Sequence, residues 1–460
     1  MKLTDEQIDM VVNEVMNKLD IQSADSDCVF EEMNQAVKAA KLAQKQLVKL
    51  SFTKRAEIIE AIRKCAYEHA ELVSCMAFHE TKMGSLEDKI IKNQIAASKT
   101  PGMEDLHPEV LSGDNGLTLI ELSPFGVIGA ITPTTNPSET VINNAIGMIS
   151  AGNAVVFSPH PKAKNTSIKM IRLLNAAIIE AGGPENIITT VNNPTIDQVN
   201  IMLSHPDIDI LVATGGPGVV KAVLSSGKKA IGAGAGNPPA IVDETADIEK
   251  AAKDIIAGCS FDYNLPCIAE KEIIVVDEVA DYLMFCMKGN GAFFIEDQAL
   301  LRRLEDLVFV NGQINKELIG KSAKYILDCL NVTYDNNVKV ISMEAPFSHP
   351  FVQDELMMPI LPVVRVKNFD EALNAAVEVE HGYRHTAVMH SKNVDRLSEM
   401  AKAIQTTIFV KNGPSFAGIG VGGEGCTAFT IAGPTGEGIT TAKTFTRRRR
   451  CVLVDGFSIR

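Results

Sequence analysis

The chain has 460 residues, 46% of them hydrophobic and 22% charged, which is typical of a soluble globular protein with two or three domains. The net charge of −13 argues against a general nucleic-acid binder, and no apolar run approaches the roughly 20 residues needed to cross a bilayer. Nine cysteines without a CxxC pair are typical of reduced thiols in a cytosolic protein, and the nine histidines are too scattered to predict a metal site.

Residues 1–20 form a separate amphipathic segment. Thr4 and Gln7 have the spacing of a capping box, and apolar side chains then recur at helical intervals: Ile8, Val11, Val12, Val15, Met16 and Leu19. Residues 21–29 are predicted to be a linker, because their first part is polar. A single helix of this length is marginal in water, so we expect it to dock either on its own chain or on a partner.

The next part of the chain predicts a parallel sheet covered by helices. Residues 30–98 have a helical pattern, and residues 117–131 predict strands that are broken by a turn at Pro124-Phe125-Gly126. The following elements are predicted next: a strand at 154–157, a helix at 166–181, strands at 187–191 and 208–213, and a helix that begins at Val219. This alternation predicts an α/β fold with a doubly wound sheet.

A second α/β region is predicted from about residue 248 to 425. It contains a strand at 272–276, a helix near 370–379 and a strand near 407–410. The end of the chain, from residue 436, contains four consecutive arginines, Arg447 to Arg450, followed by a strand-like run at 451–454.

Cys267 is the strongest candidate for a catalytic nucleophile. It lies between Pro266 and Ile268, just before the predicted strand at 272–276. A cysteine on a tight turn at a strand end can be both exposed and rigid, as a thiolate nucleophile requires. Taken alone, the same pattern also fits a buried structural cysteine.

Three further stretches have the composition of ligand-binding turns. The Thr214–Gly218 turn lies between a strand and a helix, where backbone N–H groups can face a pyrophosphate, although a plain tight turn fits equally well. Asn136 precedes Pro137, which favours an extended backbone; its amide either donates to an oxyanion or bonds its own backbone. The glycine-rich stretch 231–239 indicates close backbone packing or room for a ligand.

Together these segments resemble the aldehyde dehydrogenase superfamily. The resemblance runs from about residue 30 to the C-terminus and includes the Thr-Pro-x-x-Asn-Pro stretch, the Thr-Gly-Gly turn, the Cys267 segment and residues 355–363. It is strongest to the coenzyme-A-acylating branch, near the propionaldehyde dehydrogenases of bacterial microcompartments. The resemblance implies a Rossmann-like dinucleotide-binding domain at 30–247, a catalytic domain at 248–435 and an oligomerisation tail at 436–460, with strands at 112–130 joining the oligomerisation region.

Two positions depart from the hydrolytic branch of the superfamily. The glutamate that activates water in that branch corresponds to Ala233 here, so a thioester should survive until a thiol attacks it. The lysine that normally contacts the adenosine ribose corresponds to Ser158, which leaves the choice of NAD over NADP open.

The resemblance implies a mechanism in which Cys267 attacks an aldehyde. The Asn136 amide and the Cys267 backbone N–H hold the oxyanion, NAD is reduced, and coenzyme A removes the acyl group from a thioester on Cys267. Such chemistry needs a site that favours the Cys267 thiolate. The implied reaction converts a short aldehyde, with propionaldehyde preferred, to its acyl-CoA. The alternatives are a hydrolytic enzyme that releases free acid and an inactive shell-binding protein.

The resemblance also assigns the cofactor site. Glu355 is expected at the nicotinamide-side ribose, and Ser158 and His160 near the adenosine end. The residues expected to line the dinucleotide site are Thr132, Pro133, Gly215, Gly216, Val219 and Gly234. His385 is either near the acyl pocket or a structural histidine, and Arg447 to Arg450 either meet coenzyme A phosphates or form a solvated or subunit-interface strand.

Partners and location follow from the same resemblance. Related shell-associated enzymes use a short N-terminal helix to enter a protein shell, so residues 1–20 predict binding to a microcompartment shell protein. We therefore expect a cytoplasmic enzyme held inside a microcompartment. A homo-oligomer, either a dimer or a tetramer, is expected, and neither nucleic acid nor a membrane is an expected partner.

Overall fold

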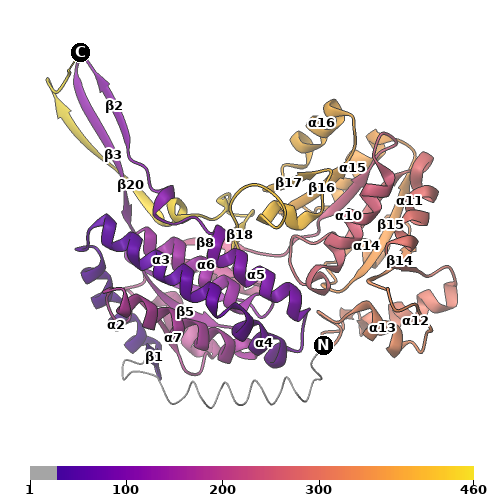
Figure 1. Ribbon diagram of the computed structural model, residues 1–460, viewed down its shortest axis with the longest axis horizontal. Helices are drawn as coiled ribbons and strands as arrows, with labels where there is room; N and C mark the ends of the chain where they lie inside the picture. Colours follow the sequence, from indigo (N-terminus) through magenta and orange to yellow (C-terminus); the bar gives the residue numbers. More distant parts are fainter. Residues whose placement is uncertain (1–27, 460) are drawn as a thin grey trace.

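The structure, a computed structural model, describes residues 28–459. Two α/β units lie side by side, and a long arm of strands projects from the first unit (Figure 1). Each unit is built on a parallel sheet with helices packed against it, as the alternation of strands and helices predicts. The amphipathic segment expected at residues 1–20 lies outside the described residues.

The first sheet has six parallel strands. Their order is β1 (Val29–Phe30), β6 (Ile188–Val191), β5 (Ala154–Pro159), β4 (Val127–Thr132), β7 (Ile210–Thr214) and β8 (Lys229–Ala233). Because Val29 already belongs to β1 and Cys28 is buried, the linker predicted at 21–29 extends too far. The strand order reverses at β4, with β5 and β6 on one side and β7 on the other. Such a reversal opens a ligand crevice at the carboxyl ends of the strands.

Helices cover both faces of this sheet. Right-handed crossovers place α6 and α7 on one face and α8 and α9 on the other. Every residue of α6 is buried, because α5 and α3 pack on its outer side. The helices are α2 (Met33–Leu47), α3 (Phe52–Glu68), α4 (Ala70–Thr81), α5 (Leu86–Lys99), α6 (Pro137–Ser150), α7 (Lys164–Glu180), α8 (Ile196–Ser204) and α9 (Pro217–Leu224).

The second sheet has seven parallel strands. Their order is β11 (Ala292–Phe294), β14 (Val340–Glu344), β15 (Ile360–Val366), β10 (Glu272–Val276), β9 (Pro239–Val242), β16 (Thr386–His390) and β17 (Ile408–Lys411). Its helices are α10 (Ile248–Ser260), α11 (Asp277–Gly289), α12 (Gln298–Val308), α13 (Ala323–Cys329), α14 (Pro350–Gln353), α15 (Phe369–Val379) and α16 (Val394–Ile404). β9 pairs with β10 and β16, so the chain enters this sheet before the predicted boundary at 247/248. This strand begins with Pro239, at the end of the glycine-rich stretch, so its sequence does not stand out as a strand.

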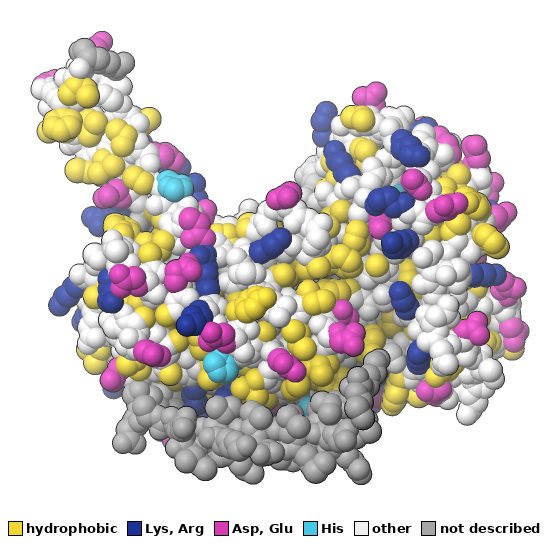
Figure 2. Space-filling view, in the orientation of Figure 1, with side chains coloured by type: hydrophobic (Ala, Val, Ile, Leu, Met, Phe, Trp, Pro, Cys, Tyr) yellow, Lys and Arg dark blue, Asp and Glu magenta, His cyan; other side chains and the backbone are white. Residues whose placement is uncertain are grey.

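The arm is an antiparallel sheet of β2 (Glu109–Gly113), β3 (Gly116–Pro124) and β20 (Thr446–Val454), with β3 in the centre. The predicted break at residues 124–126 separates β3 from β4, which enters the first sheet. The chain returns to the first unit before it reaches the arm, since Phe429 and Phe445 join the core there. Apolar side chains gather on the outer part of the arm in the space-filling view (Figure 2).

Candidate active site

A cavity of about 710 Å3 lies over the carboxyl ends of β4 and β7 and extends to the turn that carries Cys267. All eleven candidate site residues line it: Thr132, Pro133, Asn136, Ser158, His160, Gly215, Gly216, Val219, Gly234, Cys267 and Glu355. Segments from both α/β units therefore meet at one site, at the crevice that the strand order predicts. The chemical roles of these residues stay predictions.

Cys267 lies on a rigid turn between α10 and β10. Earlier in this turn, three consecutive residues have left-handed backbones: Asp262, Tyr263 and Asn264, with φ of 47°, 53° and 65°. The Asn264 amide ties the turn together, because its Nδ2 donates to Cys259 O at 3.0 Å and to Glu270 O at 2.9 Å. Cys267 is half-buried, between the two alternatives that the sequence left open, and it lines the cavity.

The resting Cys267 thiol is protonated. Burial raises its pKa to about 12, and the Glu355 carboxylate adds to this rise. Lys271 acts in the opposite direction, and its Nζ is held by Asn264 O at 3.0 Å and Asn264 Oδ1 at 2.6 Å. Burial outweighs the nearby cation, so the protein groups around Cys267 favour the neutral thiol, and how the thiolate is favoured stays open.

Asn136 ends the loop after β4 and forms the N-cap of α6, with Pro137 as the first helical residue. Its Oδ1 accepts a 2.6 Å hydrogen bond from Lys92 Nζ. Its Nδ2 donates only a long bond, 3.3 Å, to Thr135 Oγ1. With Oδ1 held in this way, Nδ2 has a free hydrogen to donate to an oxygen in the cavity.

The cavity wall fits a dinucleotide. A Cβ added at Gly215, Gly216, Gly218 or Gly234 would meet no atom within 4 Å, so the backbone there is open to a ligand. Gly216 is the N-cap of α9, where unpaired N–H groups suit a pyrophosphate. The hydroxyls of Thr132 and Ser158 are buried without a hydrogen-bond partner, and hydroxyls of this kind suit the ribose and phosphate oxygens of a cofactor.

The glycine-rich stretch at 231–239 packs closely at one position and borders the cavity at another. At Gly236 a Cβ would lie 2.8 Å from Cys267 O, so close backbone packing requires glycine there. At Gly234 the backbone faces the cavity. Ala233, the residue expected to correspond to the hydrolytic glutamate, ends β8 and is buried.

Glu355 is the single carboxylate among the described residues that line the cavity. Its Oε1 accepts a 3.4 Å bond from Gly236 N. Burial raises the pKa of Glu355, although Lys271 and the Gly236 N–H oppose this rise. A carboxylate accepts hydrogen bonds from hydroxyl groups, and the contact of Glu355 with a ribose stays a prediction.

His385 and the arginines of the tail lie outside the cavity. The imidazole of His385 is buried, with Nδ1 2.9 Å from Thr386 Oγ1, and its Nε2 has no partner. Burial lowers the pKa of His385 to about 4, so the ring is neutral at pH 7. Arg447 to Arg450 lie on β20, paired with β3 on the exposed arm.

Sequence reasoning missed several parts of the site. Helix α8 contributes an apolar wall whose i, i+3, i+7 spacing also fits an ordinary core face: Ile196, Val199 and Leu203. Phe429 reaches the cavity from the returning chain, which no local pattern indicates. Lys92 contacts Asn136 although it comes 44 residues earlier, and a lysine within a helix ordinarily predicts an exposed face.

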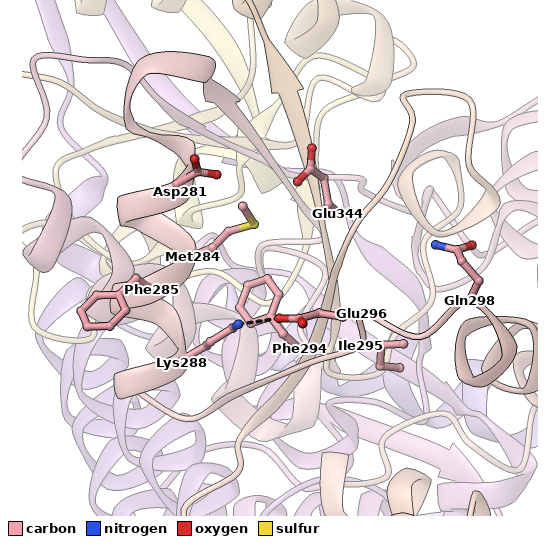
Figure 3. A pocket seen from close by; sticks show the side chains of 9 residues that line it. All are labelled: Asp281, Met284, Phe285, Lys288, Phe294, Ile295, Glu296, Gln298 and Glu344. Atoms are coloured by element: carbon pink, nitrogen blue, oxygen red, sulfur yellow. Dashed lines mark hydrogen bonds and ion pairs between the residues drawn. The ribbon is translucent and has the colours of Figure 1, made fainter.

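A second cavity, of about 420 Å3, opens on the surface of the second unit beside α11 (Figure 3). Lys288 and Glu296 form an ion pair of 2.7 Å at its wall. Of its described lining residues, none is a cysteine or a histidine.

Within residues 28–459, no group of three or more histidine, cysteine, aspartate or glutamate side chains is placed to hold a metal ion. The described helices also include none whose length and apolar character would suffice to span a bilayer.

The comparisons with known proteins agree with this geometry. Residues 12–289 match the aldehyde dehydrogenase family, and the chain belongs to that family. It is 47% identical to acetaldehyde dehydrogenase (acetylating) EutE of Salmonella typhimurium, covering 99% of this chain and 100% of that protein.

Two solved structures are also similar. Rhodopseudomonas palustris propionaldehyde dehydrogenase, with bound CoA and an acylated cysteine, is 58% identical with a TM-score of 0.93, covering 95% of this chain and 100% of that chain. A propionaldehyde dehydrogenase from the Clostridium phytofermentans fucose utilisation bacterial microcompartment is 55% identical with a TM-score of 0.92, covering 94% and 99%. These likenesses confirm the predicted fold.

Proposed function

We propose that the protein is a CoA-acylating aldehyde dehydrogenase that converts a short aliphatic aldehyde, with propionaldehyde preferred, to its acyl-CoA. The observation that carries this proposal is that Cys267 and Asn136 line the same cavity, with alanine at position 233. The R. palustris relative, with its CoA and acylated cysteine, supports the same chemistry. The first unit binds the dinucleotide, and the second carries the nucleophile.

Cys267 performs the covalent chemistry. Its Sγ loses its proton to solvent and attacks the carbonyl carbon, while Asn136 Nδ2 and the Cys267 backbone N–H donate to the carbonyl oxygen. When bound, NAD supplies the hydride acceptor that turns the adduct into a thioester. The thiol of CoA then attacks the acyl carbon, its C–S bond forms as the bond to Sγ breaks, and Cys267 recovers a proton.

Water competes poorly for the thioester, because the protein offers it no general base at position 233. Glu355, the carboxylate of the cavity wall, is engaged by Gly236 N and is assigned to the ribose. We propose NAD rather than NADP, with Thr132, Ser158 and the glycine turn as the groups that hold it. Comparing kcat/KM for the two dinucleotides tests this choice.

Product analysis tests the function directly. Purified protein, propionaldehyde and NAD should give propionyl-CoA only when CoA is present, and Cys267→Ala should abolish the reaction. Cys426→Ala is the matched control, since Cys426 is another half-buried thiol but does not line the cavity. Free propionate formed at full rate without CoA would favour the hydrolytic alternative, and a failure to bind any dinucleotide would favour the inactive shell-binding protein.

We further propose that residues 1–20 direct the enzyme into a microcompartment by binding a shell protein. The amphipathic pattern of this segment supports the proposal, as does the microcompartment origin of the C. phytofermentans relative. Residues 1–20 fused to a fluorescent protein should give punctate fluorescence in cells that make shells. Diffuse fluorescence would count against it.

We propose that the arm forms the contact of a homo-oligomer. The outer edges of β2 and β20 meet no further strand among the described residues. The arm also exposes apolar side chains that water does not favour: Val110, Leu111, Val452, Leu453 and Val454. Light scattering should show a dimer or tetramer that Val452→Asp weakens. A monomer in the unaltered protein would refute this assignment.

A further inference from the structure

A buried cluster of charges lies behind the candidate oxyanion site. Lys92 Nζ is 2.6 Å from Asp262 Oδ2, 3.2 Å from Glu139 Oε1 and 2.6 Å from Asn136 Oδ1. Lys89 Nζ is 3.3 Å from the same oxygen of Asp262. The side chains of Lys92, Asp262 and Glu139 have no exposed surface, so water screens none of these contacts.

The cluster also joins the two parts of the site. Lys89 and Lys92 lie on α5, whereas Asp262 begins the left-handed run that leads to Cys267. The Asp262 carboxylate also accepts a 2.7 Å bond from Ser85 N, at the start of α5. The ammonium of Lys92 thus touches the oxyanion residue on one side and the base of the nucleophile turn on the other.

We propose that Lys92 is a positioning residue that fixes the orientation of the Asn136 amide for the acyl-transfer reaction. A lysine ammonium only donates hydrogen bonds, so the amide atom that faces it must be the oxygen. This leaves Nδ2, the donor that a developing oxyanion needs, to face the cavity. The inference rests on the proposed role of Asn136.

The charges around Lys92 make the orientation of the Asn136 amide depend on this lysine. Without the ammonium, Asn136 would face the carboxylates of Asp262 and Glu139, which attract Nδ2 and repel Oδ1. The amide would then turn and present an acceptor to the cavity, where it would repel the oxyanion. The pKa of Lys92 lies above its ordinary value because Asp262 and Glu139 outweigh the effect of burial, so the side chain stays charged.

Lys92→Met tests the proposal, with Lys89→Met as the matched control. Both variants remove a buried cation that pairs with Asp262, but only the first loses the bond to Asn136. We expect kcat for CoA-dependent NADH formation to fall roughly 100-fold in Lys92→Met, close to the loss for one oxyanion donor, with KM for NAD unchanged. Lys89→Met should keep kcat within about threefold of the unaltered enzyme while losing a similar amount of thermal stability.

A double-mutant cycle separates positioning from general destabilisation. On an Asn136→Ala background, Lys92→Met should reduce kcat by less than about threefold, because the group it positions is gone. A loss that persists in full on that background, or an equal loss in Lys89→Met, overturns the proposal. If Lys92→Met does not fold, the same cycle with Lys92→Gln decides by the same criteria. Full activity of Asn136→Ala alone would refute the role of Asn136 itself, whereas a defective Asn136→Ala with a fully active Lys92 variant refutes only the positioning role.

Discussion

Replacing Glu355 with glutamine should make Cys267 react faster with alkylating reagents in the ligand-free protein. Burial raises the pKa of this thiol to about 12, and the Glu355 carboxylate is the next cause of the rise. At that pKa only about 1 in 10⁵ molecules carries a thiolate at pH 7, and each unit of decrease multiplies this fraction tenfold. Removing the carboxylate leaves Lys271 as the nearest opposing charge, so we expect labelling to speed up roughly 3- to 10-fold.

The assay is the rate of iodoacetamide labelling of Cys267, followed by mass spectrometry of its peptide. Labelling of the exposed Cys329, measured in the same digest, corrects for differences in reagent concentration. The control variant is Asp354→Asn, which removes the exposed carboxylate next to Glu355 in the sequence. In the unaltered protein the rate should rise about tenfold per pH unit from about pH 7 to 10 without a plateau. A plateau near pH 8, or equal rates in Glu355→Gln and the unaltered protein, would refute the electrostatic reasoning.

Three further outcomes are expected. Asn136→Ala should lower kcat about 10²- to 10³-fold in steady-state assays with little change in melting temperature, and a loss below threefold would exclude it as an oxyanion donor. Ala233→Glu should raise the share of free acid among the products, measured by chromatography at limiting CoA, and an unchanged share would show that this position does not control water. Burial lowers the pKa of His390 to about 3, so the folded state loses stability as pH falls below about 6.5. Urea unfolding at pH 7.5 and 4.5 should therefore show that the free energy of unfolding falls by about 2 to 3 kcal/mol less in His390→Leu than in the unaltered protein. Equal decreases in the two proteins would contradict the lowered pKa of His390.

Much of the fold could be predicted because its signals are local. Buried runs such as Val155 to Phe157 and Ile273 to Val276 identify parallel strands, and their alternation with helices gives the doubly wound sheet. Strand β9 could not be assigned, because it begins with a proline at the end of a glycine-rich stretch. The return of Phe429 to the first core could not be predicted either, because it depends on contacts with residues far away in the sequence.

The candidate site shows the same division between local and distant signals. Cys267, Asn136 and the Gly215-Gly216 turn stand in short motifs at strand ends, and all of them line the cavity. The charge state of Cys267 could not be predicted, because it depends on burial and on Glu355, which lies 88 residues later. Lys92 was missed because the sequence does not show that its helix is covered on the side that faces Asp262.

The central claim is that the acyl group passes through Cys267. The most direct measurement incubates the enzyme with propionaldehyde and NAD but without CoA, quenches it in acid and locates the adduct by peptide mass spectrometry. One propionyl group should be found on Cys267, and a pulse of CoA before the quench should move it to propionyl-CoA. An acyl group on another residue, or propionyl-CoA formed while Cys267 never carries one, would contradict the account.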